Sequence, residues 1–254
     1  MRKAPAPLST APSATLAGIR LLATDIDGTL THGGRIPPDV LIEFRRLSRA
    51  GVEVLPVTGR PAGETLGLAR YLPGIREAIA ENGATLVTPD LPVEALTPPP
   101  DLGRLFEAAK ELEHLGRPWT LSPDRFCRVG DVAWLREGRT DAELDGLRAV
   151  ARKLGVWLVW SSVHLHLSDH DPDKGLAVLE LARRRGIAPH EIATIGDSAN
   201  DVGLWHTGRF GLAVGTADVA AQLPVIGHPP AWITVESGAS GWLELADRLM
   251  VART

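Results

Sequence analysis

Short apolar runs alternate with segments of helical periodicity along much of this chain. The runs 19–24 and 52–57 are mostly apolar and end in polar turns, a pattern typical of strands buried on both faces of a parallel sheet. Helical spacing of apolar residues follows each run, at 38–50 and 61–71. Strand, loop and helix in this order indicate right-handed crossovers and a parallel sheet.

The same alternation resumes after residue 173. Helical patterns are predicted at 174–187, 198–208, 217–223 and 240–252, and strands at 191–197, 209–215 and 231–235. We therefore expect the two ends of the chain, 19–87 and 171–254, to form one doubly wound α/β domain with a mainly parallel sheet.

The segment 88–170 has a different character. It opens with a proline-rich passage, and two helical patterns, 101–115 and 141–154, alternate with three strand-like runs. This predicts a smaller α+β domain inserted into the first, which we call the cap.

Residues 1–18 contain two basic residues but no apolar run long enough for a secretory signal, and we expect a flexible tail. No uninterrupted apolar run approaches the ~18 residues that a membrane helix needs. Membrane insertion is therefore not expected.

Charge and cysteine content restrict the function further. A net charge of -4 gives no basic excess for nucleic acid, so any phosphate bound is expected to be small. Cys127 is the only cysteine, which excludes an intrachain disulfide and favours a reducing, cytoplasmic setting. We expect its thiol to be a core residue.

Polar clusters follow four of the predicted strands. They are Asp25 with Asp27, Thr58-Gly59-Arg60, Glu81-Asn82-Gly83, and the stretch from Asp197 to Asp201. Ligands of doubly wound sheets collect at the carboxyl ends of the strands, so these clusters should converge.

Three of these carboxylates, Asp25, Asp27 and Asp197, would repel one another without a cation between them. Oxygen-only ligation by one or two carboxylates is what Mg²⁺ prefers, usually together with a phosphate. A carboxylate held beside a phosphorus atom, Asp25, can attack it to give an aspartyl-phosphate. Asp27 would then protonate the leaving group and later deprotonate a water.

The phosphoryl oxygens also need partners. Thr58 and the amide of Gly59 can donate hydrogen bonds to them, and Lys174 can supply positive charge.

Together, DIDGT, VTGR, DKG and GDSAND, in this order and each near a strand end, resemble the four signature motifs of the haloacid dehalogenase superfamily. The resemblance covers nearly all of residues 19–250. It implies that Asp25 is the nucleophile, Asp27 the acid/base, and Thr58 and Lys174 the phosphate-binding residues. It also implies Mg²⁺ ligation by Asp25, Asp197 and the backbone carbonyl of Asp27, with Asn200 and Asp201 orienting the ligands or the phosphate.

Aspartate at position 27 resembles the phosphatases and phosphomutases of this superfamily rather than its dehalogenases. Insertion of the cap between TGR and DKG resembles the subgroup with a large α/β cap, and the phrases ATDIDGTLT and ENGA look most like archaeal-type phosphoglycolate phosphatases. The resemblance implies a Mg²⁺-dependent phosphatase for a small phosphorylated metabolite, either phosphoglycolate or a sugar phosphate. A phosphomutase and a non-catalytic phosphate sensor on the same scaffold are the alternatives.

Substrate contacts are less determined. Arg60 is read either as a substrate contact or as a surface ion pair, and Asn82 either as a substrate contact or as part of a hairpin turn. His164 and His166 share one strand face with Ser162 and Ser168, which looks toward substrate, toward water or toward a second metal. Tryptophans of the cap are expected in its core, with sugar stacking as the alternative.

Overall fold

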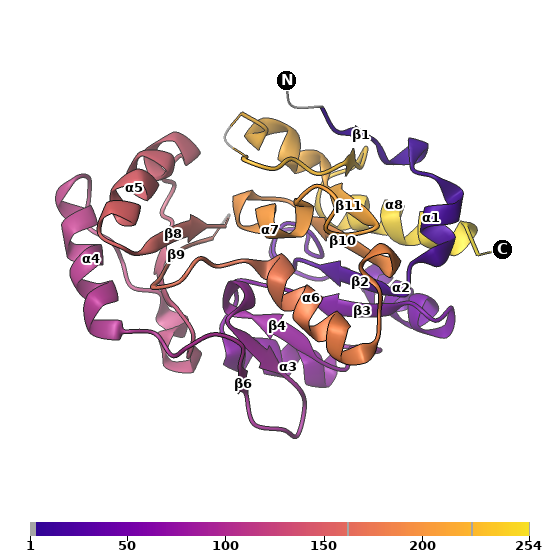
Figure 1. The fold of residues 1–254 in the computed structure, drawn as a ribbon, viewed down its shortest axis with the longest axis horizontal. Coiled ribbons are helices and arrows are strands. Elements are labelled where there is room, and N and C mark those ends of the chain that lie inside the picture. The colour runs from indigo at the N-terminus through magenta and orange to yellow at the C-terminus, as the bar shows by residue number, and fades with distance from the viewer. Residues whose placement is uncertain (1–3, 162, 225, 254) are drawn as a thin grey trace.

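A computed structural model describes residues 4–161, 163–224 and 226–253. Its centre is a six-stranded sheet with the order β1-β12-β11-β10-β2-β3, in which every pair is parallel (Figure 1). The strands are β1 (Ala6–Pro7), β2 (Leu21–Thr24), β3 (Glu53–Pro56), β10 (Ile192–Gly196), β11 (Leu212–Gly215) and β12 (Trp232–Ile233). The predicted α/β class with a mainly parallel sheet is confirmed.

Helices cover both faces of this sheet. One layer contains α1 (Ser13–Gly18), α2 (Pro38–Arg49), α3 (Ala62–Tyr71) and α8 (Gly238–Val251); the other contains α6 (Lys174–Arg185) and α7 (Val202–Trp205). Successive residues of β2 face opposite layers: Leu22 packs against the first layer and Leu21 against the second. The helix predicted at 217–223 is a 3-10 helix, Ala217–Gln222.

The N-terminal segment is ordered into the core domain from Ala6 onward, so the predicted flexible tail is wrong there. β1 pairs with β12 at the edge of the sheet, and Leu8 and Leu16 are almost fully buried in the core. Arg253 of the last turn donates a hydrogen bond to the carbonyl of Leu16. The segment therefore covers apolar surface that the edge of the sheet would otherwise expose.

A small antiparallel sheet continues the core beside β3. It consists of β4 (Ala78–Ala80), β5 (Thr85–Val87) and β6 (Glu94–Ala95), and a parallel bridge joins Val57 to Ile79. β6 lies within the predicted insertion, yet it pairs with β5, and Leu96 packs against the α6 layer. The chain thus leaves the core after about residue 96, later than the predicted boundary at 87.

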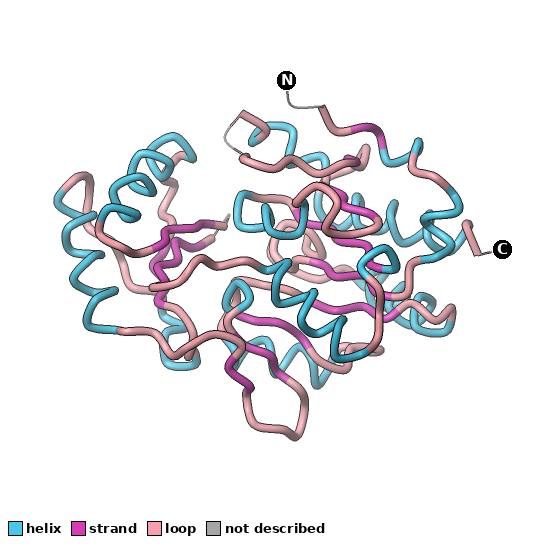
Figure 2. Tube along the Cα trace, viewed as in Figure 1, coloured by secondary structure: helices cyan, strands magenta, loops and turns pink. Residues whose placement is uncertain are grey.

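The cap has a hydrophobic cluster of its own. Its elements are α4 (Leu102–His114), β7 (Val132–Leu135), α5 (Asp141–Lys153), β8 (Trp157–Trp160) and β9 (His164–Ser168). The antiparallel sheet has the order β7-β9-β8, and α4 and α5 lie on its outer side, away from the core (Figures 1 and 2). Trp119, Trp134 and Trp160 are buried in the cluster, as expected for core residues, whereas Trp157 is only half-buried and lies outside the cluster.

Cys127 is half-buried rather than fully buried as expected. It lies where the cap meets α3, and a side chain at Gly63 would collide with it. Burial raises the pKa of the thiol, which disfavours the reactive thiolate.

Within the described ranges, no helix is both long and apolar enough to cross a membrane.

Candidate functional site

The carboxyl ends of β2 and β10 bring the first two carboxylates together. Thr24 and Ile195 are register partners, and Asp25 and Asp197 are close behind them. The amide of Asp25 donates to the carbonyl of Ile195, 2.9 Å away. Gly28, at a φ of 85°, lies so close to the Asp197 carboxylate that any side chain there would collide with it. The glycine of DIDGT is therefore required for the approach of the two loops.

Asp25, Asp197 and Asp201 form a buried acidic cluster with carboxylate oxygens within 4.8 Å of one another. Lys174, at the start of α6, is also fully buried, and its Nζ lies 2.6 Å from Asp25 Oδ1 and 2.6 Å from Asp201 Oδ1. One lysine therefore faces three carboxylates, which leaves the cluster with excess negative charge.

This excess of negative charge, together with burial, raises the pKa of two of the carboxylates. Burial raises the pKa of Asp25 to about 7 even though Lys174 acts in the opposite direction. Burial and the neighbouring Asp25 and Asp201 carboxylates raise the pKa of Asp197 well above its usual range. A bound cation would offset this repulsion and hold both groups ionised.

Asp201 differs from the other two because both of its oxygens are already engaged. Oδ1 accepts from Lys174, and Oδ2 accepts the backbone amides of Asp197 and Ser198 at 2.9 and 3.1 Å. Asp201 therefore holds Lys174 and the loop after β10. Asp25 and Asp197 remain as the carboxylates with oxygen lone pairs available to a metal ion.

Asp27 lies nearer the surface and is held by Arg60. The guanidinium makes two hydrogen bonds to the carboxylate, Nε to Oδ2 at 2.7 Å and Nη2 to Oδ1 at 2.6 Å, and it also donates to Glu64. Of the two interpretations of Arg60, the structure shows an ion pair, with the Arg60 side chain 32% exposed. This bidentate contact occupies both carboxylate oxygens of Asp27, so one of them must be released before Asp27 can exchange a proton with a ligand.

The loop of Thr58, Gly59 and Arg60 is braced by the turn between β4 and β5. The amide of Asn82 donates to the Thr58 carbonyl, and that of Glu81 donates to the Arg60 carbonyl, at 2.9 and 3.1 Å. Thr58 is buried, and its Oγ1 accepts the amide of Arg60 at 3.1 Å. The hydroxyl proton of Thr58 is therefore available for an anion. We call residues 58–60 the phosphate-binding loop, after the role that the sequence predicts for Thr58 and Gly59.

Asn82, Asn200 and His166 lie around Gly59. Asn200 donates to Asn82 Oδ1 at 3.2 Å. A Cβ built on Gly59 would lie 3.1 Å from both Asn82 Oδ1 and His166 Nε2. His166 is buried and its Nδ1 lies 2.8 Å from Asp131 Oδ2, while its Nε2 has no hydrogen-bond partner among the described residues.

The histidine face of β9 thus looks toward the core domain. Leu165 and Leu167 lie on the opposite face, in the cap cluster, as predicted. His164 is partly exposed and lies 3.1 Å from the hydroxyl of Ser122. Ser162, predicted to share this face, lies outside the described residues. For His166, 2% exposed, the alternative of a solvated face is wrong.

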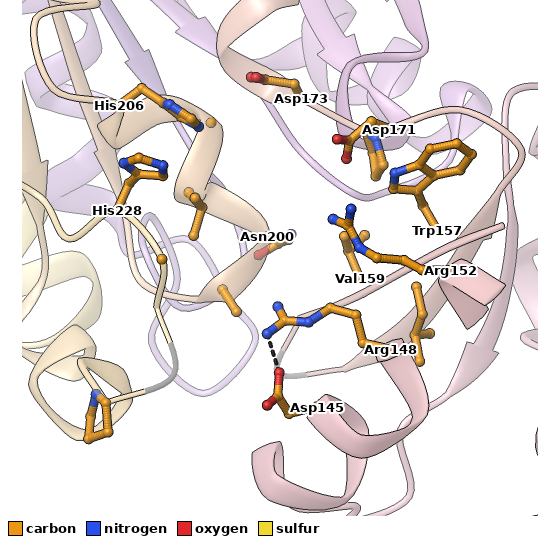
Figure 3. A pocket seen from close by; sticks show the side chains of 17 residues that line it. Asp145, Arg148, Arg152, Trp157, Val159, Asp171, Asp173, Asn200, His206 and His228 are labelled. Atoms are coloured by element: carbon orange, nitrogen blue, oxygen red, sulfur yellow. Dashed lines mark hydrogen bonds and ion pairs between the residues drawn. The ribbon is translucent and has the colours of Figure 1, made fainter. Parts of the chain in front are cut away.

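A cavity of about 640 Å³ adjoins this region, between the cap and the core (Figure 3). Arg148 and Arg152 of α5 point into it, with Trp157 on the cap side and Asn200 on the core side. Asn200 links the cavity to Asn82 and so to the phosphate-binding loop. The space is large enough for the organic part of a small phosphate ester.

Sequence reasoning missed two residues that connect the cap to this site. Glu81 is buried with its carboxylate against the backbone of 129–131, and Arg128 donates to the carbonyl of Gly59. Glu81 stood within a cluster already singled out, whereas Arg128 belongs to no motif and depends on a contact 69 residues away in sequence.

Comparison with known proteins gives a consistent result. A family model described as haloacid dehalogenase-like hydrolase matches residues 22–113 and 145–223. A phosphoglycolate phosphatase of Pyrobaculum islandicum is 31% identical over 80% of this chain and 86% of its own length. One of Nitrosopumilus maritimus is 31% identical over 91% of this chain and 96% of its own.

Solved structures share the fold at lower identity. A Thermoplasma acidophilum protein, 19% identical, superposes with a TM-score of 0.75 over 92% of this chain and 99% of its own. The sucrose-phosphatase of Synechocystis, solved with sucrose and phosphate, is 17% identical with a TM-score of 0.65 over 91% of this chain and 97% of its own. With these matches and the four motifs gathered at one sheet edge, the chain belongs to the haloacid dehalogenase-like hydrolase family.

Proposed function

We propose that this protein is a Mg²⁺-dependent phosphatase that hydrolyses a small phosphorylated metabolite through an aspartyl-phosphate on Asp25. Its family and its curated relatives make it an enzyme of the phosphatase class. The observation that carries the proposal is the buried cluster of Asp25, Asp197 and Asp201, with Lys174 as its only cation among the described residues within hydrogen-bond reach. The all-oxygen donor set and its excess negative charge fit Mg²⁺.

The residues divide the reaction between them. Lys174, the Thr58 hydroxyl and the Gly59 amide hold the phosphoryl oxygens while a carboxylate oxygen of Asp25 forms a bond to phosphorus. The ester P–O bond breaks, and Asp27 gives its proton to the departing oxygen. Asp27 then takes a proton from water, whose oxygen attacks the aspartyl-phosphate and releases inorganic phosphate. Mg²⁺, held by Asp25, Asp197 and the Asp27 carbonyl, would neutralise phosphate charge.

Hydrolysis is supported over the two alternatives. A non-catalytic sensor has no need for an attacking carboxylate or an acid/base, the two roles proposed for Asp25 and Asp27. A phosphomutase is not supported by the relatives compared above, which are described as phosphatases.

The proposal is tested by offering p-nitrophenyl phosphate, phosphoglycolate and a set of sugar phosphates to the folded protein with Mg²⁺. We expect phosphate release from at least one of these esters, and from p-nitrophenyl phosphate because its leaving group needs little recognition. Turnover of none of them, by protein shown to be folded by circular dichroism, would exclude the phosphatase.

We further assign the cavity of Figure 3 to the leaving group of the ester. Arg148 is ion-paired with Asp145 and stacks on Trp160, with its guanidinium carbon 5.0 Å from the ring centroid. The side chain of Arg152 makes no hydrogen bond or ion pair to any other described residue, although it points into the same cavity. An unpaired guanidinium suits an anionic group, such as the carboxylate of phosphoglycolate.

Arg152→Gln is therefore expected to raise the KM for phosphoglycolate about 10-fold, the effect of one charge-assisted hydrogen bond. The KM for p-nitrophenyl phosphate should not change, because its leaving group carries no anion. Lys153→Gln is the matched control, since it removes the same charge from the next residue, which does not line the cavity. Equal changes for both esters in Arg152→Gln would show that the cavity does not select anionic leaving groups.

A further inference from the structure

The cap reaches the phosphate-binding loop through one buried arginine. The Arg128 side chain is 2% exposed and lies just after the 3-10 helix Pro123–Cys127. Its Nη1 donates to the carbonyl of Gly59 at 3.0 Å and to Asp131 at 2.9 Å. Its Nε and Nη2 donate to the two carboxylate oxygens of Asp124 at 3.0 and 2.8 Å. Arg128 is therefore a fixed group and not a freely moving surface cation.

The hydrogen bond from Arg128 to Gly59 is linked, through the peptide group between Gly59 and Arg60, to the hydroxyl of Thr58. The carbonyl that accepts from Arg128 belongs to the same peptide group as the amide of Arg60. That amide donates to Thr58 Oγ1 at 3.1 Å. With its acceptor side occupied, the hydroxyl directs its proton elsewhere, which is what an anion requires. Hydrogen bonds in such a chain polarise and strengthen one another.

A second contact, made by the Glu81 carboxylate, holds the residues next to Arg128 against the core domain. The Glu81 carboxylate accepts backbone amides from both sides of the junction: Ala62 of α3 at 2.9 Å, Val129 at 3.0 Å and Asp131 at 3.0 Å. It also accepts from Gly130. Three successive amides of the cap around one buried carboxylate anchor the residues that follow Arg128.

We propose that Arg128 is a positioning residue of the phosphate-binding loop, and that this loop reaches its anion-binding geometry only when the cap is docked through Arg128 and Glu81. The proposal rests on the proposed phosphatase function. Residues 114–144, which contain Arg128, lie outside the match to the family model. Docking of the cap and completion of the phosphate site are then one event, which ties the capture of phosphate to the exclusion of bulk water.

A purely structural role is the competing explanation, because Arg128 also neutralises Asp124 and Asp131. The test therefore measures binding of inorganic phosphate by calorimetry in Mg²⁺, together with thermal unfolding. We compare Arg128→Ala with Arg125→Ala, an exposed arginine on the same 3-10 helix. Arg128→Ala is expected to weaken phosphate binding about 10-fold, and free guanidinium ions should restore most of it. Arg125→Ala should bind as the wild type does, with or without guanidinium.

Arg128→Lys covers the case in which Arg128→Ala does not fold. Lysine keeps the positive charge beside Asp124 and Asp131, but it lacks the planar fork that also reaches Gly59. We expect it to fold and to show the same weakening, which guanidinium should not relieve because the lysine side chain still fills the space. Unchanged phosphate affinity in a folded Arg128 variant, or weakened affinity in Arg128→Ala that guanidinium does not restore, would overturn the proposal. Because phosphate binding needs no turnover, a wild-type protein that binds phosphate but hydrolyses no ester would contradict only the proposed function.

Discussion

Asp25→Asn is expected to abolish phosphate release from every ester that the wild-type protein hydrolyses, a loss of at least about 10⁴-fold in kcat. The amide has nearly the shape of the carboxylate, but its oxygen is a poor nucleophile and it no longer carries charge for a metal ion. Release of p-nitrophenol measures the loss directly. Asp39→Asn, an exposed aspartate in the first turn of α2, is the control and should retain full activity.

Stability separates this effect from misfolding. The pKa of Asp25 is raised to about 7, mainly by burial, so ionisation of this carboxylate opposes folding at a pH above that value when no metal is bound. Asp25→Asn removes that cost. We therefore expect its melting temperature at pH 8 in metal-free buffer to be no lower than that of the wild type. If Asp25→Asn loses activity and also melts well below the wild type, the loss of activity is explained by a structural role of Asp25.

Asp27→Asn is expected to lower kcat by about 10²- to 10⁴-fold, which is typical of the loss of a general acid/base. The step affected differs from that of Asp25. With p-nitrophenyl phosphate the leaving group departs without a proton, so attack by Asp25 proceeds, whereas water is no longer deprotonated. Phosphoenzyme should therefore accumulate in this variant.

Arg60→Met is the control for the ion pair that holds Asp27. Arg60 orients the carboxylate but donates no proton in the proposed reaction. Its removal should cost less activity than Asp27→Asn and should not cause phosphoenzyme to accumulate. Equal losses in the two variants would mean that Asp27 acts only through its contact with Arg60.

The central sheet could be predicted because its strands are short apolar runs buried on both faces, as Leu21 and Leu22 illustrate. From a parallel sheet it follows that Asp25, Asp197 and the loop at Thr58 meet at one edge. The packed N-terminal segment was not predicted, because β1 has two residues and the buried Leu8 and Leu16 stand in a stretch without clear periodicity.

The parts of the site that could not be predicted depend on contacts between segments far apart in the sequence. The Asp27–Arg60 pair and the Arg128–Gly59 hydrogen bond join residues that no local sequence pattern relates, so only the packed chain reveals them. Glu81 illustrates the same limit, since its φ of 51° and its burial against the cap depend on tertiary structure. The roles of Asp25 and Asp27 are predictions that the experiments above address, and those of Thr58 and Lys174 also remain predictions.

The central claim is that the phosphoryl group is transferred to Asp25 before it is released as inorganic phosphate. Asp27→Asn is mixed with p-nitrophenyl phosphate and Mg²⁺, quenched in acid and digested, and its peptides are analysed by mass spectrometry. We predict one phosphoryl group on the peptide that contains Asp25, removable by hydroxylamine as an acyl phosphate and absent when Asp25 is also changed to Asn. Phosphate carried by another residue, or steady hydrolysis by the wild type with no phosphorylated Asp25 in the trapping variant, would contradict the mechanism.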